Sequence, residues 1–137
     1  MEAKLKHLEF IQAVIARMAT NQFLFKGWAI TIAAALSAFA AVDTRWALLV
    51  VALASTLLFW GLDGYYLWLE HGFVKLHNIV AVKDEADIDF TMKIDKSNAT
   101  SEWLRTCMRH HLYAFYGIIV IVDCVGIVVI KSVVGGK

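Results

Sequence analysis

Three long apolar stretches dominate the pattern of hydrophobic and polar positions, and they cover residues 23–42, 46–66 and 112–131. Each is about 20 residues long, which is the length that an α-helix needs to cross the hydrocarbon core of a bilayer. The chain has no proline, so nothing in the sequence forces a break into a long helix. The pattern therefore predicts three transmembrane helices, the third of them contained in a longer helix over residues 101–131.

Residues 1–20 show a different pattern, with apolar and polar positions on two faces of a predicted helix. The apolar positions recur at helical spacing, and they are Leu5, Leu8, Ile11, Val14, Ile15 and Met18. Such an amphipathic helix lies either along the membrane surface or against another part of the same protein. The residues favour the two arrangements about equally.

The region between the second and third apolar stretches is polar and mixed in pattern. The second helix is expected to continue to Asn78, and a connector follows over residues 79–100. Within it, residues 87–95 (DIDFTMKID) alternate apolar and polar side chains, which is typical of a half-buried strand. No second strand pattern is present, so the segment either pairs with a copy of itself or another protein, or lies as an extended arm on the helices.

Composition agrees with a membrane protein. The 137 residues are 60% hydrophobic and 18% charged, whereas a soluble domain has about 45–50% apolar residues and about a quarter charged ones. The chain is too short for two globular domains, so residues 1–137 are expected to form a single membrane domain. A net charge of +1 argues against general nucleic-acid binding. The predicted class is an all-α membrane protein with a short strand-like segment.

Lysine and arginine are distributed unevenly about the predicted spans. Nine of them precede the first span or lie between the second and third, and Lys26 lies at the start of the first span on the same side. Arg45, Lys131 and Lys137 lie on the other side. The positive-inside rule therefore predicts a cytoplasmic N-terminus, a cytoplasmic segment 67–111 and an external C-terminus. The expected location is a plasma membrane, crossed three times.

One carboxylate lies in the middle of the third span, YGIIVIVDCVGIVVIK (residues 116–131). At 1.5 Å per residue, Asp123 is about 16 Å from Leu112, close to the centre of a hydrocarbon core about 30 Å thick. A charged aspartate there costs about 2.5–3.5 kcal/mol, and such residues usually face a bundle interior or a water-filled path. The residues that share its helical face are Tyr116, Ile119, Gly126 and Ile130.

Three interpretations of Asp123 remain open. In one, protonated Asp123 forms a hydrogen bond with Ser37, Ser55 or Thr56 inside a single protomer and holds the helices together. In another, several protomers assemble and Asp123 forms a ring that faces a cation path. A proton relay is the third. The second intramembrane acid, Asp63, lies near the cytosolic end of its span, where it either reaches water or contributes to the mouth or gate of a pore.

No motif of enzyme chemistry is found: there is no G-x-S-x-G, phosphate-binding glycine loop or H-E-x-x-H. The histidines match no metal-site spacing, so we expect no metal, no cofactor and no enzyme activity. The expected cytosolic region carries basic and aromatic side chains that are suited to a small anionic ligand such as a nucleotide, and they are Lys93, Lys96, Trp103, Arg105 and Arg109. Positive-inside bias explains the same basic residues without a ligand.

Two motifs carry a resemblance to a broad group of small bacterial membrane proteins with three spans. They are LEFIQAVIARMATNQFLFKGWAI (residues 8–30) and FWGLDGYYLWLEHGFVKLHN (residues 59–78), and the FYG of residues 115–117 opens the third span. The positions that belong to the shared pattern are Glu9, Arg17, Lys26, Trp28, Asp63 and Glu70. Asp123 has no counterpart in that pattern.

Most proteins of this group have no known activity, and some are similar to membrane effectors of anti-phage defence that act by abortive infection. The resemblance implies an effector that perturbs the bacterial inner membrane when a partner senses infection. Combined with the ring interpretation of Asp123, it leads us to expect a homo-oligomer of four or more copies that forms an ion-conducting pore or disrupts the membrane. A cytosolic sensor protein or a nucleotide-type ligand is the expected control. The alternative is a non-conducting membrane adaptor or assembly subunit that docks a cytosolic partner through the edge of the strand-like segment.

Overall fold

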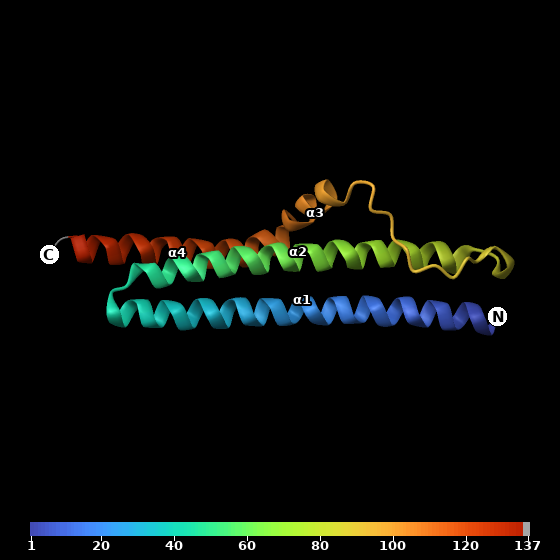
Figure 1. Ribbon diagram of the computed structural model, residues 1–137, viewed down its shortest axis with the longest axis horizontal. Coiled ribbons are helices and arrows are strands. Elements are labelled where there is room, and N and C mark those ends of the chain that lie inside the picture. Colours follow the sequence, from blue (N-terminus) through green and yellow to red (C-terminus); the bar gives the residue numbers. More distant parts are fainter. Residues whose placement is uncertain (136–137) are drawn as a thin grey trace.

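Four helices and one short 3-10 turn make up the computed structural model, which describes residues 1–135. α1 (Glu2–Asp43) and α2 (Trp46–Val82) form a long antiparallel hairpin (Figure 1). α4 (His110–Gly135) lies along the half of α2 that is nearest to the hairpin turn. The two smaller elements between α2 and α4 are the 3-10 turn η1 (Glu85–Asp87) and α3 (Ala99–Cys107).

α1, α2 and α4 are each long and apolar enough to cross a membrane. Residues 1–135 form helices and connecting segments, with no strand among them. This confirms the predicted all-α class with three candidate membrane spans. Lys137, one of the three basic residues expected on the external side, lies outside the described residues.

The separate amphipathic helix expected over residues 1–20 is not found, because α1 runs without a break from Glu2 to Asp43. Two polar residues between the expected amphipathic helix and the middle of the first span, Gln22 and Lys26, have partners on α2 and do not interrupt α1. The first half of α1 therefore packs against the second half of α2. We call this part of the molecule, residues 2–20 and 67–82, the stalk.

The strand-like segment is an extended arm laid on the stalk (Figure 1). Ile88 packs with Ile11 and Val80 in a small apolar cluster between the arm and the two long helices. Further along, Ile94 lies against Gly72, where an added Cβ would be 3.2 Å from Ile94 Cδ1. The two outer apolar positions of the alternating pattern, Ile88 and Ile94, are thus used for contacts with helices, and a paired strand does not form within residues 1–135.

Two predicted helices differ from the structure, one in its end and one in its continuity. α2 continues four residues past Asn78 and ends at Val82. The single helix expected over residues 101–131 is divided between α3 and α4 at Met108 and Arg109. The physical reason for the break is a tertiary contact, because the carbonyl oxygen of Cys107 accepts a hydrogen bond from the indole Nε1 of Trp60.

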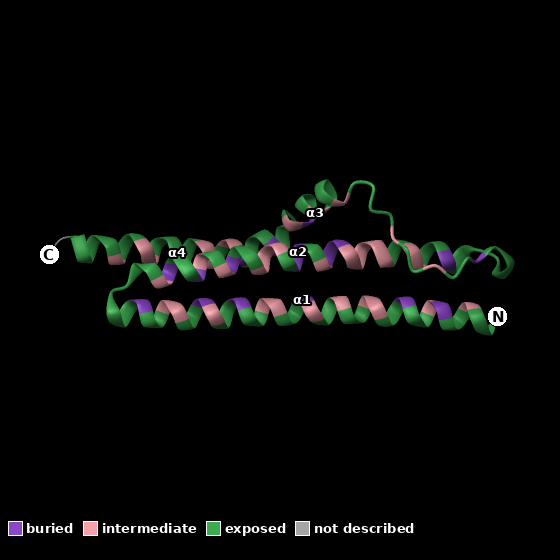
Figure 2. Ribbon diagram, in the orientation of Figure 1, coloured by how far each residue is buried: buried purple, intermediate pink, exposed green. Residues whose placement is uncertain are grey.

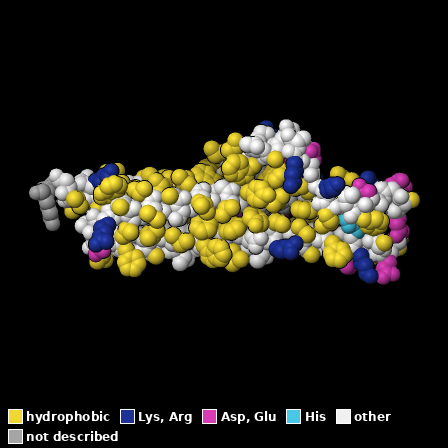
Figure 3. Space-filling view, in the orientation of Figure 1, with side chains coloured by type: hydrophobic (Ala, Val, Ile, Leu, Met, Phe, Trp, Pro, Cys, Tyr) yellow, Lys and Arg dark blue, Asp and Glu magenta, His cyan; other side chains and the backbone are white. Residues whose placement is uncertain are grey.

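Buried residues form a narrow stripe where the helices meet, and most of the remaining surface is exposed (Figure 2). Small residues dominate the contact of α1 with α2, where Ala29, Ala33 and Ala40 are buried, as expected of helices that approach closely in lipid. In the most apolar stretch of α4 only 6% of the residues are buried. Figure 3 shows hydrophobic side chains over the membrane half of one face and charged ones toward the stalk and the turn.

Candidate functional site

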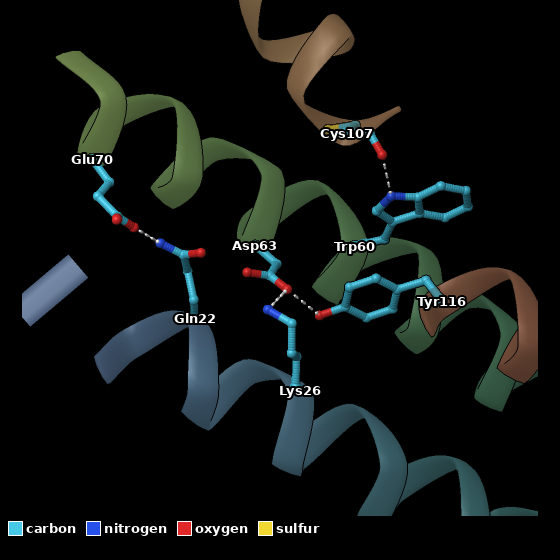
Figure 4. Close-up of polar contacts among 7 residues, drawn as sticks. All are labelled: Gln22, Lys26, Trp60, Asp63, Glu70, Cys107 and Tyr116. Atoms are coloured by element: carbon cyan, nitrogen blue, oxygen red, sulfur yellow. Dashed lines mark hydrogen bonds and ion pairs between the residues drawn. The ribbon is translucent and has the colours of Figure 1, made fainter. Parts of the chain in front are cut away.

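A buried cluster of three polar side chains joins the three membrane helices (Figure 4). The Nζ atom of Lys26 on α1 lies 2.6 Å from Oδ2 of Asp63 on α2. The hydroxyl group of Tyr116 on α4 donates a hydrogen bond to the same oxygen over 3.0 Å. Asp63 and Tyr116 are completely buried, whereas Lys26 is partly exposed. One oxygen atom thus ties three helices together.

The distance of this cluster from the hairpin turn follows from helix geometry. Lys131 Nζ lies 4.3 Å from the centre of the Trp46 ring, so these two residues mark the level of the hairpin turn. Asp63 follows Trp46 by 17 residues along α2, which corresponds to about 26 Å. A hydrocarbon core is about 30 Å thick, so a span that begins at the hairpin turn would reach the level of the cluster shortly before its far boundary.

The ion pair contributes to stability only while both partners are present. Taking Lys26 and Asp63 out of water is costly, and their mutual attraction repays that cost only when the geometry is good. The short contact and the added bond from Tyr116 provide that geometry. Removing one partner of such a pair typically costs about 3–5 kcal/mol, because the other charge stays buried.

α3 is fastened to α2 beside this cluster by indole groups. Trp103 Nε1 donates to the carbonyl oxygen of Gly61 over 3.0 Å, and Trp60 Nε1 donates to that of Cys107 over 2.9 Å. The backbone of α3 approaches closely because Gly64 has no side chain: an added Cβ there would overlap the sulfur of Cys107 and lie 3.3 Å from its Cα. Toward the stalk, a further hydrogen bond joins α1 to α2: Gln22 Nε2 donates to Glu70 Oε2 (Figure 4).

Asp123 lies near the centre of the third span and is also buried, with 1% of its surface exposed. Ser37 Oγ donates to its Oδ1 over 3.4 Å. Within residues 1–135, its Oδ2 has no hydrogen-bond partner. Of the three hydroxyl groups expected near it, Ser55 and Thr56 instead donate to carbonyl oxygens of their own helix, at Val51 and Ala52.

The predicted face of α4 is divided between different contacts. Tyr116 belongs to the cluster with Asp63, and Ile119 is half-buried. Gly126 packs against Leu49, where an added Cβ would lie 2.9 Å from Leu49 Cδ1. Gly126 and Ile130, with Ser37, line a groove of about 430 Å³ at the turn end of the molecule. Asp123 is thus within the three-helix packing of one chain, and its bonded Ser37 lines this groove.

The expected anionic-ligand residues are only partly brought together. Lys93, Arg105 and Arg109 line a second groove, of about 640 Å³, in the stalk, which we call the stalk groove. Lys96 is not part of its lining, and Trp103 uses its indole nitrogen on α2. Among residues 1–135 there is no group of three or more His, Cys, Asp or Glu side chains that could hold a metal ion.

Sequence reasoning missed Lys26 as the partner of Asp63, although the chain contains a signal for it. Lys26 is the lone charged residue inside the first apolar stretch, 17 residues before Asp43, and Asp63 lies 17 residues after Trp46. In an antiparallel hairpin with a turn at residues 43–46, positions that are equally far from the turn lie opposite each other. Counting from the turn would therefore have paired them.

No known family matches the chain, and neither curated proteins nor solved structures provide a match. The functional proposal therefore depends on the buried polar side chains described above.

Proposed function

We propose that the protein is an oligomeric effector of the bacterial inner membrane that conducts ions or disrupts the membrane under control from its cytosolic side. In this proposal the stalk is cytosolic and the hairpin turn is external, as the positive-inside pattern predicts. The observation that carries the proposal is Asp123, a carboxylate at mid-membrane depth with one long hydrogen bond and one oxygen without a partner among the described residues.

A carboxylate in this state is expensive to keep in the middle of a membrane. Buried polar groups are normally hydrogen-bonded, and intramembrane acids that are not paired usually mark a path for ions or protons. Asp123 is held to α1 by Ser37 alone, and α4 presents most of its apolar surface outward. Such a surface is suited to lipid or to further copies of the chain, which a pore would need, because three helices enclose no channel.

The Lys26–Asp63–Tyr116 cluster supports control at the opposite end of the bundle. It connects all three helices at the boundary with the stalk. A change in the stalk that moves Asp63 away from both Lys26 and Tyr116 would release α1 and α4 from α2 together. In the proposed mechanism, this release allows α4 to turn and Asp123 to face a path formed by several copies.

The test is ion current through the purified protein in planar bilayers, with particle size measured beforehand in detergent. We expect discrete cation-selective steps from particles of four or more copies. Asp123→Asn keeps the size of the side chain and removes its charge, so cation selectivity should change while the oligomer persists. Cys124→Ser is the matched control, because Cys124 is the exposed neighbour of Asp123.

The adaptor is the second candidate, and the extended arm favours it. Residues 88–96 form no helix or sheet within residues 1–135. Their backbone is left-handed at Phe90, where φ is 51°, and Phe90 and Met92 are exposed at 46% and 38%. An exposed extended backbone is able to receive a strand from a partner. A silent monomer or dimer, with and without cell extract, would contradict the effector. Copurification of one soluble protein at a fixed ratio, without toxicity on overexpression, would then support the adaptor.

A further inference from the structure

The stalk groove brings together three segments that are far apart in the sequence. Its walls are the stalk part of α2, the end of the extended arm and α3. Its volume of about 640 Å³ falls within the range of about 300–1,000 Å³ that is common for small-molecule sites. The groove is therefore large enough for a small ligand.

Four lysine and arginine side chains line this groove, and they are Lys75, Lys93, Arg105 and Arg109. Within residues 1–135, none of them forms an ion pair with a carboxylate. This is notable in a site that also contains Asp95 and Glu102. Four like charges gathered in one groove repel each other, and an anion between them would remove that repulsion.

The two acids of the groove are already engaged by other groups. Glu102 Oε2 accepts a hydrogen bond from Trp68 Nε1 over 3.0 Å. Asp95 Oδ1 accepts one from the backbone amide of Ser97 over 2.9 Å, and this bond holds the pKa of Asp95 below its ordinary value. Asp95 also lies close enough to Lys75 for that charge to help lower the pKa of Asp95, so the lining combines four cations with two carboxylates and keeps an excess of positive charge.

Arg109 is oriented by a neutral partner. Its Nη1 lies 2.8 Å from Nε2 of His71. Because a guanidinium group can only donate, His71 accepts this bond and carries its own proton on Nδ1. Partial burial and the charge of Arg109 lower the pKa of His71, so the ring stays neutral near pH 7. The guanidinium group is thus fixed in direction and keeps its full charge.

We propose that the stalk groove binds a phosphate group, carried either by a soluble nucleotide or by the headgroup of an anionic phospholipid. Lysine supplies point charges and arginine supplies planar paired donors, which is the combination that phosphate oxygens favour. His71 lies eight residues beyond Asp63, about 12 Å further along α2. The groove therefore begins at headgroup depth and continues away from the membrane, so both sources are within reach. This proposal does not depend on ion conduction.

The experiment compares two variants with the same change of charge. Lys93→Gln with Arg105→Gln removes two cations of the groove. Lys96→Gln with Arg17→Gln removes two exposed cations that lie outside it. Inorganic pyrophosphate is titrated calorimetrically into protein in phosphatidylcholine nanodiscs, and native mass spectrometry counts the phosphatidylglycerol molecules retained by protein in detergent. Circular dichroism checks that each variant is folded.

The groove pair is expected to weaken pyrophosphate binding about tenfold or more, and the outer pair less than about twofold. That result assigns the site to a soluble phosphate. Retention of phosphatidylglycerol by the natural protein and by the outer pair, but not by the groove pair, assigns it to a lipid headgroup. Equal losses in the two pairs would mean that general surface charge is responsible and would overturn the proposal. Absence of both pyrophosphate and phosphatidylglycerol binding by the natural protein would overturn it as well.

Discussion

Asp63 and Asp123 are the same residue type, both buried in the membrane half, and their surroundings differ. Asp63 receives a lysine from α1 at 2.6 Å and a tyrosine hydroxyl from α4 at 3.0 Å. Asp123 receives one serine hydroxyl at 3.4 Å. Each has one oxygen without a hydrogen-bond partner in the described part of the chain. Burial alone therefore does not say what a membrane carboxylate is for.

This difference in partners suits Asp63 to a structural role and makes Asp123 the candidate for function. Asp63 is compensated by an opposite charge and connects three helices, so it is expected to determine how they pack. Asp123 has weak compensation at a greater depth, where a charge costs more. This difference is why our proposal assigns the ion path to Asp123 and the closure to Asp63.

The largest effect should come from removing the compensating charge of Asp63. Lys26→Met keeps the apolar stem of the side chain and leaves Asp63 buried without its counter-charge, so we expect a loss of about 3–5 kcal/mol in the free energy of unfolding. Titration with sodium dodecyl sulfate in mixed micelles measures this loss.

The control for this experiment removes both charges. Lys26→Met combined with Asp63→Leu leaves no buried charge, and replacing a buried ion pair by apolar residues is often close to neutral. The double variant should therefore be more stable than Lys26→Met alone. A single variant that loses less than about 1 kcal/mol would show that Asp63 does not depend on Lys26.

The second effect concerns the bond between α4 and Asp63. Tyr116→Phe removes one hydroxyl group and nothing else, and a hydrogen bond to a charged acceptor contributes about 1.5–3 kcal/mol. The same titration should therefore detect a loss in that range. Tyr113→Phe is the matched control, since Tyr113 is half exposed on the same helix and should change stability little. Equal losses of unfolding free energy in both variants would show that the bond from the Tyr116 hydroxyl group to Asp63 does not contribute to stability.

Much of the fold could be predicted from the sequence because lipid imposes strong rules on composition. Helix length and hydropathy identify the three spans. Counting residues from the ends of these spans places Ser37 at about the same membrane depth as Asp123. The continuity of α1 could not be predicted, because it depends on Gln22 and Lys26 finding partners on another helix. Local pattern treats those residues as exposed to water.

The break between α3 and α4 and the stalk groove were beyond prediction for a related reason. Trp60, which lies 47 residues before Cys107 in the chain, donates a hydrogen bond to its carbonyl oxygen. No local sequence pattern indicates that contact. The groove requires Lys75 and Lys93 to lie near Arg105, which follows from the arm folding back along α2. Only the basic character of the region was visible in the sequence.

The smallest expected effect belongs to the bond that holds Asp123. Ser37→Ala removes its hydrogen-bond donor, and hydrogen bonds between membrane helices average about 0.6 kcal/mol. A loss of about that size, clearly smaller than that of Tyr116→Phe, would preserve the contrast between the two acids. Ser55→Ala is the control, because Ser55 bonds within its own helix and should change stability by a few tenths of a kcal/mol at most. If Ser37→Ala were as costly as Tyr116→Phe, Asp123 would be held as firmly as Asp63, and its cost would be explained by packing without any ion path.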